Sequence, residues 1–127
     1  MKKLIISADD LGLTKSINQA IFSAHRDGLL TSASILANGD YFEDAARLFK
    51  NVNSISIGVH INLIRGRPVA KISSLCVPGE EKFFNNTKLF IYRYCLRRIK
   101  YEDLYSEVFA QVEKVYNFGI KISHLDT

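Results

Sequence analysis

The chain has 127 residues, of which 47% are hydrophobic and 24% charged, and its formal net charge is +4. This balance is typical of one globular domain and excludes the disordered and fibrous classes. No apolar run approaches the roughly 20 residues that cross a bilayer, and the first residues lack the core of a signal peptide. We therefore expect a cytoplasmic protein without membrane contact.

The basic residues and the cysteines do not indicate a special class of partner. Cys76 and Cys95 have no further thiol or imidazole at ligand spacing, so neither is expected to bind zinc. No aromatic platforms alternate with the main basic cluster, which favours a solvated helix face over nucleic-acid binding. That cluster consists of Arg93, Arg97, Arg98 and Lys100.

The first segments of the chain predict a strand, a turn and a helix. Leu4–Ile6 is a short apolar run that indicates a buried strand, and a turn is expected at Asp9–Gly12. Apolar residues then recur three and four apart from Lys15, which is the spacing of an amphipathic helix. Thr14 is placed to cap its start, and Asp27-Gly28 to end it.

The same alternation continues toward the middle of the chain. Residues 33–37 predict a second strand, and Asp40 with Glu43 suggests a capping box ahead of a second helix. Alternating apolar residues over 55–59 predict a third strand that ends at His60. Since strands that alternate with helices favour parallel pairing, the sequence predicts an α/β architecture.

The second half of the sequence predicts a long loop, two helices and a fourth strand. Residues 65–86 contain both prolines and little periodicity, and loops of this length are usually functional. Helices are expected over 88–98 and 102–116. A strand should start at residue 121 and run into Asp126. The apolar face of the second helix is expected to hold Leu104, Val108, Val112 and Val115.

Polar side chains follow three of the predicted strands at the point where each strand ends. These groups are Asp9-Asp10, His60 with Asn62, and His124 with Asp126. The carboxyl ends of parallel strands lie at one edge of a sheet, so these side chains should lie close together. A carboxylate and imidazoles can hold a divalent ion, and a second carboxylate can take a proton from water.

Each group also has a purely structural interpretation. The Asp9–Gly12 segment can form a turn that caps a helix, and a lone His60 is more often a satisfied core histidine. Asn62 can simply hold its own loop by hydrogen bonds. His25, close to a predicted helix C-terminus, is expected to be structural. The occurrence of such residues at three strand ends together favours a functional site.

Three segments resemble the YdjC-like family of carbohydrate deacetylases in their order and spacing. They are Ser7–Leu13, Gly58–Leu63 and Ser123–Thr127. The resemblance implies an irregular (β/α) barrel of which residues 1–127 form the N-terminal part. It also implies hydrolysis of N-acetyl groups on amino sugars or short oligosaccharides, with a divalent metal ion, Mg²⁺ or Zn²⁺. In the family, the segment matching residues 31–34 runs through the floor of the site.

The resemblance also assigns roles to individual residues. Asp9 is expected to be the catalytic base, Asp10 the metal carboxylate and His60 the first metal imidazole. His124 and Asp126 are expected to orient the site or to act as substitute ligands, and Asn62 is a candidate contact to the sugar. The second imidazole of the family motif is expected just beyond Thr127, which makes the sequence look truncated.

Two other classes remain as alternatives. Acidic residues after the first strand also suit a phosphoacceptor receiver domain, but there the third strand should end in Asp, and here it ends in His60. A non-catalytic assembly module is the other alternative, and self-association through the uncovered barrel edge is expected. The aromatic residues expected to form an exposed patch are Tyr41, Phe42, Phe83, Phe84 and Tyr92.

Overall fold

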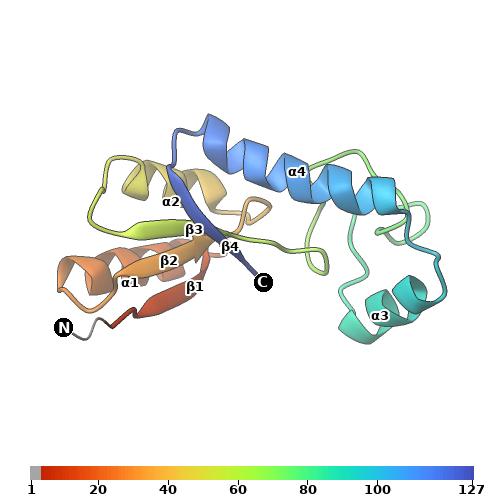
Figure 1. Ribbon diagram of the computed structural model, residues 1–127, viewed down its shortest axis with the longest axis horizontal. Coiled ribbons are helices and arrows are strands. Elements are labelled where there is room, and N and C mark those ends of the chain that lie inside the picture. Colours follow the sequence, from red (N-terminus) through yellow and green to blue (C-terminus); the bar gives the residue numbers. More distant parts are fainter. Residues whose placement is uncertain (1–3) are drawn as a thin grey trace.

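The computed structural model describes residues 4–127, and its centre is a parallel sheet of four strands (Figure 1). The strands pair in chain order, and every neighbouring pair is parallel. They are β1 (Ser7–Leu11), β2 (Ser32–Ile35), β3 (Ser56–His60) and β4 (Ile122–Asp126). The helices are α1 (Lys15–Arg26), α2 (Phe42–Phe49), α3 (Thr87–Cys95) and α4 (Tyr101–Asn117). The predicted α/β class is confirmed.

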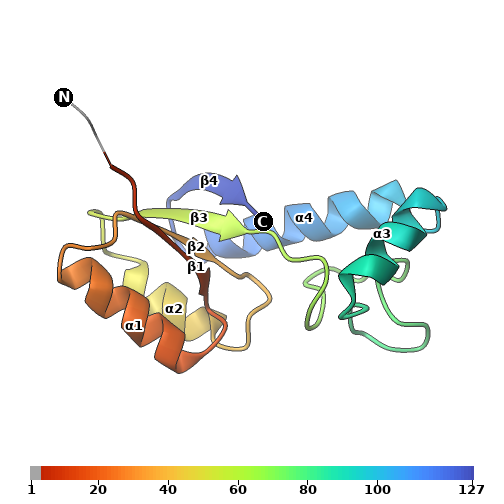
Figure 2. The same cartoon turned by 90° about the horizontal axis from the view of Figure 1, so that it is seen from below.

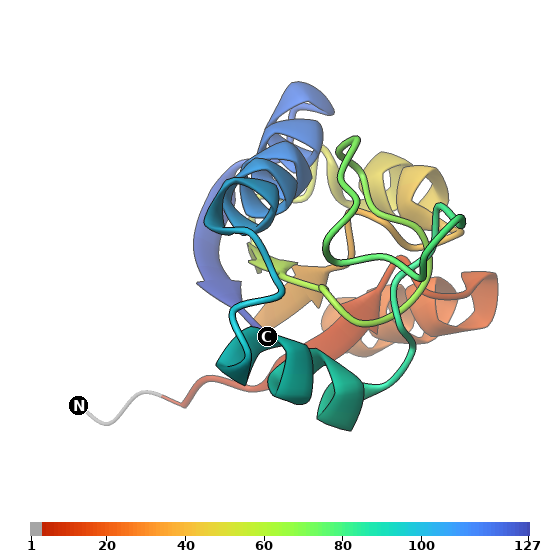
Figure 3. The same ribbon diagram turned by 90° about the vertical axis from the view of Figure 1, so that its right-hand side faces the viewer.

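The helices α1, α2 and α4 lie around one side of the sheet (Figure 3). Successive strand residues point to opposite faces, so β2 and β3 are divided into an apolar and a polar face. Ala33, Ile35, Ile57 and Val59 belong to the core beneath the helices. The alternate positions of these strands include Ser34, Gly58 and His60, which places small and polar groups on the face away from the helices.

The first predicted strand is displaced. Leu4 and Ile5 are more than three-quarters exposed, and the strand begins only at Ser7. The carbonyl of Ile6 does accept hydrogen bonds from the amides of Thr31 and Ser32. However, this run continues beyond the covered part of the sheet, as the view from below shows (Figure 2). The prediction that Leu4–Ile6 is a buried strand is therefore wrong, because apolar character alone does not bury a segment.

The predicted caps of α1 are confirmed, but the predicted N-terminal cap of α2 is wrong. The Thr14 hydroxyl accepts a hydrogen bond from the Ile17 amide at 3.2 Å, and Asp27 ends α1, as predicted. At α2 the N-cap is Tyr41, without a side-chain cap, so the predicted capping box is wrong. The amide of Tyr41 bonds instead to the carbonyl of Gly12, and Glu43 pairs with Arg47 at 2.9 Å.

The long loop and the two later helices are present, but two predicted surfaces differ. Of the four apolar residues expected on one face of α4, Val115 is fully buried and the other three are half-buried. The fully buried residues of α4 also include Glu107 and Gln111. The predicted aromatic patch does not form either, since three of its five members pack into the interior. These are Phe42, Phe83 and Phe84, which are at most 9% exposed.

α3 is shorter than the predicted helix over 88–98, and none of its residues is buried. Within the described residues, no helix combines the length and the apolar character that crossing a membrane would require.

Candidate metal site

The bends in the two outer strands determine how their acidic and imidazole side chains point. Three steps along β1, from Ala8 to Leu11, match only two along β2, so β1 contains a bulge at Asp9 and Asp10. Asp10 takes a left-handed backbone conformation with φ of 61°, which aspartate tolerates better than most residues. Bulges re-aim side chains and are frequent beside active sites.

A similar irregularity lies in β4. Two steps along β3, from Ile57 to Val59, match three along β4, from Ile122 to Leu125. The extra residue falls at Ser123 or His124, and beyond it Asp126 stands opposite His60 in register. Both outer strands are thus bent next to their acidic or imidazole groups, close to the carboxyl ends of the strands.

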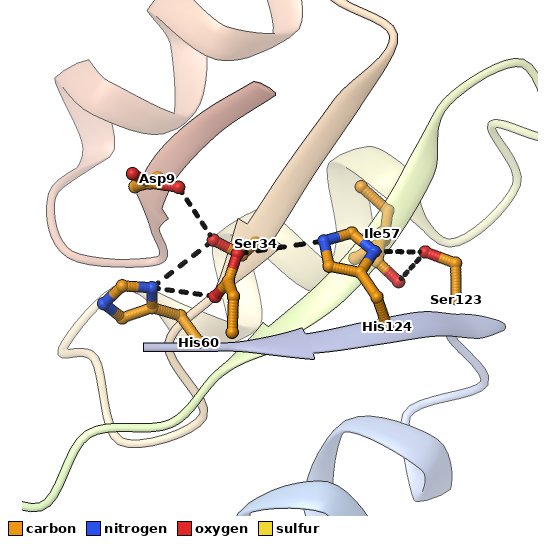
Figure 4. A network of polar contacts seen from close by, with 7 residues as sticks. Asp9, Ser34, Ile57, His60, Ser123 and His124 are labelled. Carbon is orange, nitrogen blue, oxygen red and sulfur yellow. Dashed lines mark hydrogen bonds and ion pairs between the residues drawn. The ribbon is translucent and has the colours of Figure 1, made fainter. Parts of the chain in front are cut away.

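Asp9, His60 and Asp126 come together at this edge of the sheet. One ligand-type atom of each lies within 4.8 Å of the others. Ser34 lies between them, since its hydroxyl is 3.2 Å from Asp9 Oδ1 and 3.4 Å from His60 Nδ1 (Figure 4). Two carboxylates and one imidazole in this arrangement can hold a divalent cation.

The hydrogen bonds of His60 define which ring nitrogen is free. Nδ1 lies 3.0 Å from Asp126 Oδ1, and an ionised carboxylate can only accept, so Nδ1 carries the proton. Ser34 can then direct its own proton to Asp9. In the neutral ring the lone pair is at Nε2, which is the arrangement of a metal-binding histidine oriented by a carboxylate. The His60 side chain is 18% exposed, so the ring remains accessible.

His124 packs across β3 at a position that only glycine allows. Any Cβ on Gly58 would overlap with the His124 ring. Ser123 Oγ donates its single proton to the Ile57 carbonyl at 3.0 Å, so it accepts from His124 Nδ1 at 2.7 Å. The other nitrogen, Nε2, lies 3.8 Å from Asp126 Oδ2. Asp126 thus stands between the two imidazoles.

Asp10 lies outside the three-residue group but lines the cavity next to it. That cavity also contains His60, Asn62 and Arg65 in its wall. The structure therefore brings the predicted residues to one edge, as expected from the strand ends. It places Asp9 and Asp126, rather than Asp10, in the group with His60.

The Asn62 side chain organises the loop that follows His60. Its Oδ1 accepts from the amides of Ile64 and Arg65, both at 3.1 Å. Its Nδ2 donates to Asn38 Oδ1 and to the Arg65 carbonyl, both at 3.0 Å. Two acceptor and two donor positions are the full capacity of an amide. This pattern favours the alternative in which Asn62 holds its own loop, while contact to a sugar stays a prediction.

His25 is structural in this fold, in agreement with its predicted role. Its ring nitrogens lie 2.8 Å from the Leu30 carbonyl and 2.8 Å from the Ser54 hydroxyl, so the ring links two loops.

Three residues that shape the site were not predicted individually from the sequence. They are Ser34, Glu107 and Gln111. Ser34 alternates with core residues on β2, a period-2 signal that could have placed it on the polar face.

Known proteins are similar to this chain in sequence. The model of the family described as YdjC-like protein matches residues 3–127. Curated relatives named carbohydrate deacetylase include proteins of Clostridium beijerinckii and Geobacillus stearothermophilus, 34% and 35% identical over 98% and 97% of this chain. The match covers 49% and 47% of those proteins, so the chain spans about half the length of these relatives.

A solved structure is similar as well. It is that of a candidate cellobiose-phosphate cleavage protein from Enterococcus faecalis V583, with a TM-score of 0.80 and 29% identity. The similarity covers 98% of this chain and 48% of that one. The fold of the described residues is therefore shared with a crystallised protein.

Proposed function

The chain belongs to the YdjC-like family, and on that premise we propose that the protein is a metal-dependent carbohydrate deacetylase. Its substrates would be N-acetylated amino sugars or short oligosaccharides, and its reaction the hydrolysis of the acetamide bond to acetate and a free amine. The names of the curated relatives support this reaction class. The observation that carries the proposal is the convergence of Asp9, His60 and Asp126 within 4.8 Å.

The donor set fits a divalent ion. Carboxylate oxygen and imidazole nitrogen suit Zn²⁺ and also harder ions such as Mg²⁺, so the residues do not select one metal. One carboxylate and one imidazole from these residues leave coordination positions for water and substrate. When bound, the ion would polarise the acetyl carbonyl and lower the pKa of a water molecule.

Asp9 is the residue we assign to take the proton from the attacking water. Its Oδ1 is engaged by the Ser34 hydroxyl, so Oδ2 is the atom assigned to accept that proton. The side chain is exposed, and water therefore reaches it. Ser34 fixes the position of this carboxylate, and a general base must be positioned within hydrogen-bond reach of the proton that it removes.

His60 and Asp126 form the second functional unit. Asp126 accepts the Nδ1 proton of His60 in a hydrogen bond, which leaves the lone pair of Nε2 free to bind a metal ion. We assign Asp10, on the cavity wall, as the carboxylate that completes the metal site. Asp9 and Asp10 are adjacent carboxylates on the same bulge of β1, so either could serve as the metal ligand. The proposal therefore requires a test that separates the two aspartates.

Asp9→Asn and Asp10→Asn provide that test, made in the complete gene product. Acetate release from an N-acetylglucosamine disaccharide reports turnover, and calorimetric titration with Zn²⁺ reports metal binding. We expect Asp9→Asn to bind Zn²⁺ normally and to lose turnover, by about 100-fold or more for a missing general base. We expect Asp10→Asn to lose Zn²⁺ affinity. Full turnover in Asp9→Asn would contradict the assignment of the base.

Two features of the whole molecule belong to the same proposal. We propose that these residues form the first part of a single (β/α) barrel, which the match over about half of each relative supports. Self-association also stays a prediction. Light scattering of the purified protein would test it, because a monodisperse monomer would contradict it.

A further inference from the structure

Three polar residues follow one another along the inner face of α4. Asp103, Glu107 and Gln111 are spaced four apart, so they lie in one row on the helix surface. Glu107 and Gln111 are both 0% exposed. A buried carboxylate is costly unless hydrogen bonds satisfy it, so its retention requires specific partners. Those partners all belong to the loop after β3 or to α4 itself.

The Glu107 carboxylate holds the middle of this loop. Its Oε1 accepts from the Val69 amide at 3.0 Å, and its Oε2 accepts from the Ala70 amide at 2.8 Å. Gln111 Nε2 donates to the same Oε1 at 2.8 Å. Hydrogen bonds to a charged group in a buried site are among the stronger ones in proteins. Glu107 thus binds the loop backbone and also fixes the amide of Gln111.

Gln111 holds the beginning of the loop. Its Oε1 accepts from the Asn62 amide at 3.1 Å, and its Nε2 donates to the Asn62 carbonyl at 2.7 Å. The preceding residue, Ile61, donates its amide to the Asp126 carbonyl at 2.9 Å. The chain is therefore fixed on both sides directly after His60, by the sheet and by α4. Figure 3 shows this loop beside α4.

This fixed segment is a wall of the cavity at the metal site. Residues 60–65 line that cavity together with Asp10. The side chain of Asn62 bonds to the amide and carbonyl of Arg65, and Asn38 also donates to the Arg65 carbonyl. The position of Asn62 therefore determines the position of the wall up to Arg65.

We propose that Glu107 and Gln111 are positioning residues for substrate binding: by holding the backbone of Asn62, they set the wall formed by residues 60–65. This inference rests on the proposed function, since it takes the cavity beside His60 to be the substrate site. Neither side chain touches the substrate. Each acts through the loop, so its loss should weaken substrate binding more than it slows the chemical step.

The test uses Gln111→Leu, with Glu107→Gln as a second, size-conserving variant and Asp103→Ala as the matched control. Asp103 also accepts two loop amides, from Ser73 at 3.2 Å and Ser74 at 2.8 Å, but these lie farther along the loop. The three variants therefore remove the same kind of contact from one helix. Only the first two affect the segment next to His60.

For Gln111→Leu we expect KM for the disaccharide to rise about tenfold while kcat changes less than about threefold. Hydrogen exchange of the Asn62 and Arg65 amides should accelerate by about tenfold or more, and Zn²⁺ affinity should stay within about threefold. Glu107→Gln should change in the same direction. Asp103→Ala should lower the Tm but leave KM and the exchange of residues 62–65 unchanged.

Equal KM values in Gln111→Leu and Asp103→Ala, with unchanged exchange at residue 62, would overturn the proposal. If the unaltered protein releases no acetate, the proposed function fails, and exchange at residues 62–65 alone decides the positioning role. If Gln111→Leu does not fold, hydrogen exchange in the unaltered protein tests the inference instead. The Asn62 amide should then be protected as well as the amides of β3, and rapid exchange there would overturn the inference.

Discussion

Replacing Gly58 by alanine tests whether the His124 ring truly lies against β3. A Cβ at this position would stand 2.5 Å from His124 Cδ2 and 2.7 Å from Cε1. Carbon atoms prefer about 3.5 to 4.0 Å, so the ring must move by about 1 Å. Its hydrogen bond to Ser123 and its approach to Asp126 would then be lost or strained. Overpacking of this kind costs about 1 to 3 kcal/mol.

The assay is a double-mutant cycle on stability. We expect Gly58→Ala to lower the Tm by roughly 4 to 12 °C, taking about 4 °C per kcal/mol for a chain of this size. In a His124→Ala background the obstacle is gone, so Gly58→Ala should be nearly neutral there. The two changes should therefore couple by about 1 kcal/mol or more. Additive effects would refute the packing described for Gly58 and His124.

Three further predictions follow from single contacts. Asp126→Ala should weaken Zn²⁺ binding by about 10- to 100-fold, whereas Asp126→Asn, which can still accept from His60, should lose less; equal losses by calorimetry would mean that Asp126 is itself a ligand. Burial opposes ionisation of Asp103, but hydrogen bonds from Ser74 and Ser73 and the charge of Lys100 outweigh it and lower its pKa below 3.8. Ionised Asp103 therefore stabilises the fold above that pH, and the Tm advantage over Asp103→Asn should disappear as the pH falls through the lowered pKa; a difference that persists in acid would contradict this. Thr14→Ala should cost about 1 kcal/mol in thermal unfolding, and an unchanged Tm would refute the role of Thr14 as the cap of α1.

The sequence was most informative where local chemistry and fold rules agree. The strand-end rule placed Asp9, His60 and Asp126 together without any knowledge of distances, because parallel strands bring their carboxyl ends to one edge. The cap at Thr14 was readable because capping involves residues only three positions apart. Such signals are local in sequence or fixed by topology.

Features that depend on a partner segment could not be read in this way. The bulge at Asp9 and Asp10 exists only relative to the register of β2, so no local pattern marks it. Glu107 and Gln111 look like solvent-facing helix residues, and their burial depends on loop amides 38 and 49 positions away. The prediction for the apolar Leu4–Ile6 run was wrong for the converse reason, since Leu4 and Ile5 find no segment among the described residues that buries them.

The most direct test of the metal site is calorimetric titration with Zn²⁺ of the unaltered protein, His60→Gln and His25→Gln. His25 is the matched control, because its ring is also held by hydrogen bonds but links two loops away from the cluster. At pH 7 we expect one equivalent of Zn²⁺ to bind the unaltered protein and His25→Gln. His60→Gln should bind about 100-fold more weakly or not at all. Equal affinity in all three proteins would contradict a metal site at His60.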